Sequence, residues 1–280
     1  MIELLTAVTI LMIIVSIMGV IFAESDRAWT QGTSMVESNT EGRAALNMLS
    51  HDLQYAIADG TLTFTMRPDR EGLVTFNREN SEICFVSLSQ RPETSGSGNA
   101  RATQQIFYYL EEKTHNDKVS GIPLGRFQLM RTAINTDIPG NSSAYDNPLW
   151  YEQGANDSGR GTFHSTAVIA ENVVALQFFA PCFISKDPRT GVKTWTTLQT
   201  YNSDVNELNE GYDNHNDSQL PAYVDVVLEI MGEKDAIRAA DLADRLSDVD
   251  PKVLDFVEKQ SRRYTTRVYL KNRAGYRKRT

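Results

Sequence analysis

The chain has 280 residues, of which 41% are hydrophobic and 23% are charged, and its formal net charge is −8. This length allows one sizeable buried core. The negative charge argues against a general nucleic-acid-binding protein, so no nucleic-acid partner is expected.

The N-terminal run Leu4–Ala23 contains no charged residue. An α-helix rises about 1.5 Å per residue, so the run is long enough to cross the ~30 Å hydrocarbon layer of a membrane. A cleaved secretory signal fits less well, because no lysine or arginine precedes the run. A plain single-pass anchor explains the length but not Glu3, because an ionised group is costly in lipid.

Helical character is predicted to continue after the apolar run, since Glu24–Ile57 contains no proline. Apolar residues there recur at spacings of three and four, on one helical face: Leu46, Leu49, Leu53 and Ile57. Weak helix formers at positions 32–34 and 38–42 predict a bend or a melted turn. The Asp59-Gly60 pair is expected to end this helix of about 55 residues, which is apolar first and amphipathic later.

The rest of the chain is predicted to be a head of mainly antiparallel strands, because alternating, β-branched and aromatic segments recur along it. The predicted strands are Thr61–Met66, Leu73–Phe76, Glu82–Leu88, Gln104–Glu111, Phe127–Thr132, Ala167–Phe179, Ala222–Met231 and Tyr264–Leu270. Polar loops are expected at 90–101, 139–161 and 185–191. We therefore expect an α+β fold with a helical part, 1–60, that crosses a membrane at about 4–23, and a globular head, 61–280.

Two short helices are predicted between the last two strands, within about 233–260. Alanine and leucine recur at helical spacing after Gly232. Asp250 followed by Pro251 is typical of an N-cap and a first helical position. This insert either covers one sheet edge or offers a docking surface to a partner protein.

Candidate site residues are few. Cys84 and Cys182 could form a disulfide in an exported protein, or both could be buried thiols, because sequence does not show whether they lie close together. Segment 201–217 is oxygen-rich and suits calcium chemically, but its spacing fits no EF-hand, so a solvated loop is preferred and no metal site is assigned. Its candidate ligands are Asp204, Asn206, Glu207, Asp213, Asn216 and Asp217.

Catalytic motifs are missing from the sequence. The four histidines are scattered, and no nucleophile elbow, phosphate-binding loop or glycine fingerprint occurs. We expect no enzymatic activity and no cofactor. The basic C-terminal tail, from Lys271 onward, is expected to be solvated, although contact with phosphate or lipid headgroups stays open.

The string "IELL" at Ile2–Leu5, followed by an apolar helix, resembles the mature N-terminus of type IV pilins and type II secretion pseudopilins. Those chains commonly begin Phe-Thr-Leu-Ile-Glu-Leu-Leu. Met1 would then stand two residues inside the usual mature start. We therefore expect the reading frame to extend upstream by a short basic leader, a glycine and about two more residues.

Later segments are similar to J-type minor pseudopilins and the related PilW pilins. These segments are Ala45–Ile57, Glu171–Pro181, Leu220–Ile230 and Arg262–Arg273. The size of the chain and its helical insert also resemble the C member of a pilin-like cassette from Verrucomicrobia. The resemblance implies a pilin-like fold and a single-pass protein of the bacterial inner membrane with its head in the periplasm.

The resemblance also implies a role for Glu3. In such filaments the N-terminal helices pack as a bundle, and the carboxylate of Glu3 would pair with an N-terminal amine, its own or a neighbour's, because a charge in that bundle needs a cation. The alternative is that Glu3 reaches the lipid headgroups.

The implied function is that of a minor pseudopilin at the tip of a periplasmic pseudopilus for protein secretion. The implied partners are other minor and major pseudopilins or pilins, prepilin peptidase, the inner-membrane assembly platform and membrane lipid. Two alternatives stay open. One is a minor type IV pilin for pilus initiation or DNA uptake, and the other is a stand-alone membrane-anchored binding module.

Overall fold

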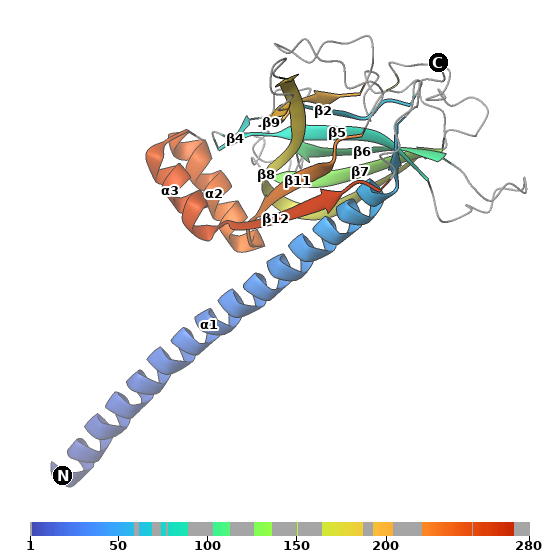
Figure 1. The fold of residues 1–280 in the computed structure, drawn as a ribbon. Coiled ribbons are helices and arrows are strands. Elements are labelled where there is room, and N and C mark those ends of the chain that lie inside the picture. Colours follow the sequence, from blue (N-terminus) through green and yellow to red (C-terminus); the bar gives the residue numbers. More distant parts are fainter. Residues whose placement is uncertain are drawn as a thin grey trace, which may run out of the picture.

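A long N-terminal apolar helix packs by its second half on an antiparallel β sheet, and its first half projects away from the head (Figure 1). The α+β prediction is confirmed at this level. The computed structural model describes residues 2–58, 62–68, 74–76, 78–88, 103–112, 126–135, 150, 164–186, 193–203, 220–247 and 249–271.

The described elements follow one another along the chain in the colours of Figure 1. They are α1 Ile2–Gln54, β1 Ala56–Ile57, β2 Thr65–Pro68, β3 Val74–Thr75, β4 Arg78–Glu79, β5 Ser81–Leu88, β6 Thr103–Glu112, β7 Phe127–Asn135, β8 His164–Lys186, β9 Lys193–Leu198, β10 Tyr201–Asn202, β11 Tyr223–Ile230, α2 Glu233–Leu246, α3 Pro251–Gln260 and β12 Arg262–Tyr269.

Helix α1 is continuous over 53 residues, so the predicted bend or melted turn is wrong. The hydroxyl residues of its middle part do not compete with the helix. Thr33 and Ser38, for example, donate to the carbonyls of Trp29 and Ser34 one turn earlier, at 3.0 and 2.9 Å. Each glycine costs the helix only about 1 kcal/mol, which neighbouring turns can offset.

The helix ends at Gln54, earlier than the predicted stop at Gly60. Ile57 therefore does not continue the helical face, and that prediction is corrected. Instead, Ala56 and Ile57 pair with Ser87 and Val86 of β5. Ladder hydrogen bonds to an already formed sheet satisfy the backbone of this segment better than another exposed helical turn would.

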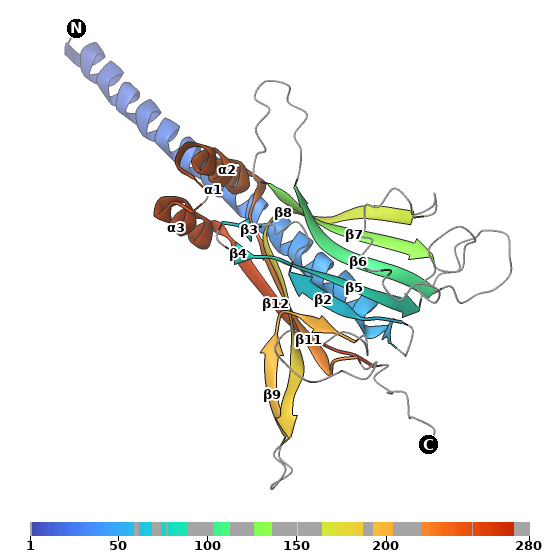
Figure 2. The same ribbon diagram turned by 90° about the horizontal axis from the view of Figure 1, so that it is seen from above.

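The main sheet has ten described strands, all paired antiparallel, in the order β10-β2-β5-β6-β7-β8-β11-β12, with β1 beside β5 and β9 beside β8. Strand β8 connects the two parts of this sheet, because it lies between β7 and β11. It pairs first with β7, then with β11 and finally with β9 (Figure 2). Asn172, whose φ of 54° lies in the left-handed region that asparagine tolerates, sits where pairing changes from β7 to β11.

Most predicted strands are found with shifted ends. β2 begins at Thr65 instead of Thr61, and β8 extends to Lys186, into the predicted turn 185–191. Strand β9 was not predicted. The expected loops at 90–101 and 139–161 lie outside the described residues except for Trp150.

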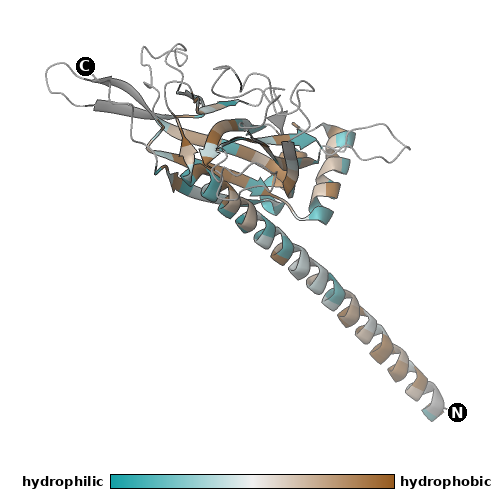
Figure 3. Ribbon diagram, turned by 90° about the vertical axis from the view of Figure 1, so that its right-hand side faces the viewer, coloured by the Kyte–Doolittle hydropathy of each residue, from teal (hydrophilic) through white to brown (hydrophobic). Residues whose placement is uncertain are grey.

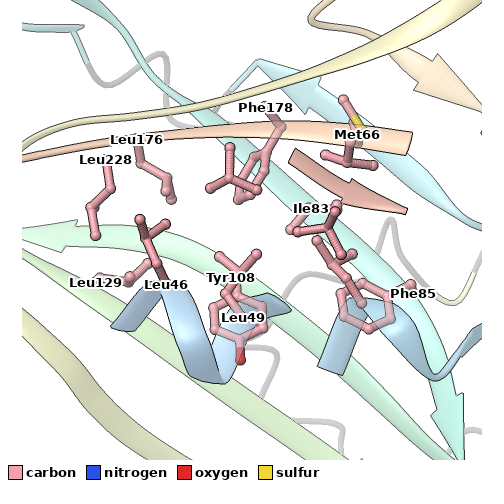
Figure 4. Packing of buried hydrophobic residues seen from close by; sticks show 14 of the residues in the cluster. Leu46, Leu49, Met66, Ile83, Phe85, Tyr108, Leu129, Leu176, Phe178 and Leu228 are labelled. Atoms are coloured by element: carbon pink, nitrogen blue, oxygen red, sulfur yellow. The ribbon is translucent and has the colours of Figure 1, made fainter. Parts of the chain in front are cut away.

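The main core lies between α1 and the inner face of the sheet. Leu46 and Leu49 of α1 point toward side chains such as Leu129 and Phe178 (Figure 4). The outer face is also covered where β5, β6 and β7 lie, because Trp150 packs edge-on against Phe107 with ring centroids 5.3 Å apart. Strand β5 consequently buries both of its faces.

The predicted helical insert is present as α2 and α3. The Asp250 carboxylate accepts a hydrogen bond from the Lys252 backbone N–H at 2.8 Å, and Pro251 occupies the first turn, as predicted. The inner faces of both helices form a third apolar cluster with the head, which comprises Phe76, Val174, Met231, Ala236, Ala239, Val253 and Val257. Figures 1 and 2 show the insert at the end of the head from which α1 projects.

Candidate functional site

The candidate functional site is the first half of α1, because its apolar surface has no partner within the described chain. Figure 3 shows this half projecting from the head, with much of it coloured as hydrophobic. An 18-residue stretch of the helix has a mean hydropathy of 2.6, and none of that stretch is buried. Ile10, for example, is 58% exposed. By length and composition this helix can cross a membrane. Its exposed apolar residues are Ile2, Val8, Ile10, Leu11, Met12, Ile13, Ile14, Val15, Ile17, Met18, Val20, Ile21 and Phe22.

The hydroxyls within this apolar half are satisfied locally. Thr6 donates to the Glu3 carbonyl and Thr9 to the Thr6 carbonyl, both at 2.9 Å. Ser16 donates to the Met12 carbonyl at 2.8 Å. Because these donors bond within the helix, they do not prevent it from entering lipid.

Glu3 lies in the first turn of α1 and is exposed. Its negative charge is favourably placed there, since helix N-termini carry partial positive charge. No ion pair joins Glu3 to another described residue, and Met1 lies outside the described part. Pairing with an N-terminal amine therefore stays a prediction.

The second half of α1 is fixed to the head by an ion pair as well as by leucines. Asp52 accepts hydrogen bonds from Arg131 Nε of β7 at 2.7 Å and from the Tyr108 hydroxyl of β6 at 2.8 Å. The side chains of Asp52 and Arg131 are mostly buried. The last turn of the helix is thereby held to two neighbouring strands, in addition to its apolar contacts.

The environment of this network shifts two ionisation equilibria. The pKa of Tyr108 is raised well above its ordinary value. Burial of the phenol is the largest cause, and the negative charge of the nearby Asp52 carboxylate is the second. Burial alone would lower the pKa of Arg131, but its hydrogen bond and charge interaction with Asp52 outweigh that effect and raise it. At neutral pH the phenol is therefore a neutral donor and the guanidinium is charged, which is the state that holds α1.

A second group of contacts fixes the middle of α1 to strand β12. The Tyr264 hydroxyl donates to Asn39 Oδ1 at 2.6 Å, and the Tyr264 ring lies over Gly42. A Cβ at Gly42 would lie 2.7 Å from the ring, so the missing side chain is what allows this approach. Glu41 also accepts from the backbone N–H of Glu171 in β8.

The remaining predicted site residues are not brought together by the described structure. Cys84 is buried in β5, whereas the side chain of Cys182 in β8 lies outside the described part, so the disulfide stays a prediction. The six candidate calcium ligands lie in 204–219, also outside it. Among the described residues, no group of three or more His, Cys, Asp or Glu side chains is placed to hold a metal.

Two large apolar residues that follow the apolar run, Trp29 and Val36, were not predicted to be exposed. Trp29 is 77% exposed and Val36 is also exposed, seven residues apart and seven and fourteen residues after Phe22. This spacing places the three side chains near one face of α1. The signal that reveals them is the seven-residue recurrence within an otherwise polar stretch.

No protein-family model matches the chain, and no curated protein matches it either. The geometry of the site combines an unpacked apolar half-helix, an acidic residue in its first turn and a second half that is docked on the head.

Proposed function

We propose that the chain is a minor pseudopilin-like structural subunit, which joins a periplasmic filament for protein secretion through the first half of α1. The observation that carries this proposal is the exposed apolar surface of that half. An apolar helix in water is unfavourable by about 25 cal/mol for each Å² exposed, so the surface needs lipid or other apolar helices around it. A filament subunit requires both, lipid before assembly and neighbouring helices afterwards.

The firmly held second half of α1 supports the same proposal. A subunit that is pulled into a filament by its helix must transmit force to its head. Asp52 with Arg131, and Tyr264 with Asn39, tie the helix to β7 and β12 at two levels. A helix used only as a membrane tether does not need such attachment, because a flexible linker serves equally well.

Glu3 would set the axial position of the subunit in the filament. A carboxylate among apolar helices is costly unless a cation pairs with it. An N-terminal amine of the same or a neighbouring subunit is a cation at the right level of a helix bundle. Partners would be other minor and major pseudopilins, with prepilin peptidase and the assembly platform acting beforehand.

The experiment is site-specific photocrosslinking in the source bacterium. A photoreactive amino acid replaces Ile13 on the apolar half, and a matched variant carries it at the exposed Asp244 on α2. The proposal predicts that position 13 crosslinks to other proteins that begin with an apolar helix after a processed leader. Crosslinks from position 13 to lipid alone would instead favour a stand-alone anchored binding module. If those partners belong to a surface pilus, the minor type IV pilin alternative holds.

A further inference from the structure

A groove lies between the middle of α1 and the start of the helical insert. Its volume is about 620 Å³. Gly232 lies against Ser34 in its inner wall, because a Cβ on this glycine would come 2.3 Å from Ser34 Oγ. Ser34 follows Ala23 by eleven residues, so this wall stands about 16 Å beyond the apolar run, past a headgroup layer of roughly 5–7 Å. The lining residues are Asp26, Arg27, Thr30, Ser34, Met35, Ser38, Gly232, Lys234, Asp235, Arg238, Gln260 and Arg262.

Positive charge predominates in this groove, although the whole chain has a net charge of −8. The lining has four basic side chains and two acidic ones. Arg27 is paired with Glu24 at 3.2 Å. Lys234 and Arg238 lie one turn apart on α2, are exposed, and form no ion pair with any residue in the described ranges. Two cations are therefore available to an acidic protein segment at this level.

A strongly acidic stretch of the same chain has no role in the function proposed above. Segment 204–217 contains five Asp or Glu residues and no Lys or Arg. It lies outside the described residues, but its C-terminal flank is described. There Ala222 accepts a hydrogen bond from the Leu270 N–H at 3.4 Å. The ammonium of Lys271 lies 5.7 Å from the centre of the Tyr55 ring, so this flank is close to the end of α1.

The N-terminal flank of the acidic segment lies at the same end of the head. Ser203 donates its backbone N–H to the Phe64 carbonyl at 3.0 Å, and its hydroxyl accepts the Phe64 N–H at 2.8 Å. The Phe64 ring lies 6.0 Å from the ring of Phe85. Phe85 precedes Val86, which pairs with Ile57 just after α1. Both flanks are therefore remote from the groove.

The docked part of α1 separates the acidic segment from the groove of its own chain. Ser34 lies twenty residues before the end of α1 at Gln54, which is about 30 Å along the helix. Sixteen residues separate Ser203 from Leu220, so a loop that leaves and returns spans about 30 Å only with both arms fully extended. Its tip alone would then arrive, with most of its acidic residues left behind. The groove of another copy, displaced along the helix axis, has no such restriction.

We propose that this groove binds the acidic segment 204–217 of a second copy of the chain. Lys234 and Arg238 would pair with carboxylates of that segment, because complementary charges select and orient a partner at an interface. The contact joins the far end of one head to the insert end of the next (Figure 1), and two different surfaces allow it to repeat along a filament.

The same geometry predicts when the contact forms. Two copies anchored at equal depth hold the groove and the acidic segment about 30 Å apart in height. The contact is made once one copy has moved along its helix axis, as a subunit entering a filament does. This inference rests on the proposed assembly into a filament, and it names one of the contacts between subunits.

The first test measures binding of a synthetic peptide to the full chain, purified in a neutral detergent. The peptide has the sequence of residues 204–217 and a fluorescent label, and anisotropy reports its binding. Lys234→Gln with Arg238→Gln should weaken binding about threefold to tenfold, as expected for two partly exposed ion pairs. The control, Lys252→Gln with Lys259→Gln, removes the same charge from α3 outside the groove and should leave binding unchanged.

A peptide with its five acidic residues replaced by their amides should bind at least fivefold more weakly. Equal binding of the two peptides, or equal loss in both double variants, would overturn the proposal. Circular dichroism checks that the variants fold. If the groove variant does not, raising the salt from 50 to 500 mM should still weaken binding of the acidic peptide to the wild type, and an unchanged affinity overturns the proposal.

The second test uses whole chains in the native host. A photoreactive amino acid replaces Thr30, which lines the groove, and a second copy carries a different tag. The proposal predicts a crosslink between the two copies that maps to 204–217 by mass spectrometry. A crosslink to another segment or only to a different protein overturns it. Crosslinks from position 13 report assembly separately, so assembly without the crosslink from position 30 refutes only this inference.

Discussion

The two halves of α1 belong to one helix but have opposite relations to the rest of the chain. In the first half Ile10 is 58% exposed, whereas in the second half Leu49 is 1% exposed. The more apolar half is the one that the described head does not cover. The distribution of apolar residues around the helix explains this difference. A stripe of apolar residues can be buried by one face of a sheet, whereas a helix that is apolar on all sides needs an apolar environment on every side.

The largest effect is expected for Leu49→Ala. Leu49 lies in the core between α1 and the sheet (Figure 4). The change removes buried methyl groups and leaves a cavity, so the free energy of unfolding of the head should fall by about 2–5 kcal/mol. Urea denaturation of the detergent-solubilised chain, followed by near-ultraviolet circular dichroism, measures it.

Ile13→Ala in the first half of α1 is the matched control. It removes a similar volume from an exposed position, so the unfolding midpoint of the head should not change. A loss of more than about 1 kcal/mol in this variant would show that the two halves are not energetically separate.

A smaller loss is expected for Asp52→Asn. The change leaves Arg131 without its carboxylate in a mostly buried site, which should cost about 2 kcal/mol. The exposed pair of Asp225 and Arg267 gives the comparison, because Asp225→Asn at the surface should cost clearly less stability than Asp52→Asn. Similar losses for both variants would mean that Asp52 is not a specific attachment point of the helix.

The dependence on pH should be smaller again. Because the pKa of Tyr108 is raised in the folded state, the phenol is neutral in both states below the ordinary tyrosine pKa of about 10. Above that pH the unfolded chain loses the proton and the folded chain keeps it, so stability falls. Between pH 9 and 11 the loss should be about 1 kcal/mol larger in the wild type than in Tyr108→Phe. Parallel pH profiles would refute this linkage.

A small effect on the head is expected even from removing the apolar half altogether. A chain that lacks residues 1–28 should be a soluble, folded head, because the core is built by the strands and the second half of α1. Its free energy of unfolding should lie within about 0.5 kcal/mol of that of the full chain, a value typical for sites without shared contacts. Aggregation of the truncated chain would contradict the two-part description of α1.

Much of this architecture could be predicted from local patterns. The spacing of Leu46, Leu49 and Leu53 identifies the docked face, and Asp250 before Pro251 identifies the start of α3. Each of these patterns lies within a short segment of the chain. The strands were likewise found where side chains alternate, although their ends depend on the partner strand and shifted by several residues.

What the sequence could not show depends on contacts between distant segments. Ile57 continues the helical spacing but lies in β1, because β5 offers its backbone a ladder. The link from Asp52 to Arg131 joins residues 79 positions apart. Exposure of Trp29 was also not predictable, since an isolated tryptophan in a polar stretch is compatible with a buried or an exposed position.

The central claim is that the first half of α1 assembles with neighbouring subunits through Glu3. The most direct test compares wild type and Glu3→Leu in crosslinking from position 13, in the native host. The variant removes a charge and leaves a more apolar helix, so membrane insertion and head stability should be unchanged. We predict that crosslinks to neighbouring subunits are lost, because in the proposed bundle the register would depend on the pairing of the carboxylate. Wild-type crosslinks in Glu3→Leu would contradict the claim and leave α1 as a simple anchor.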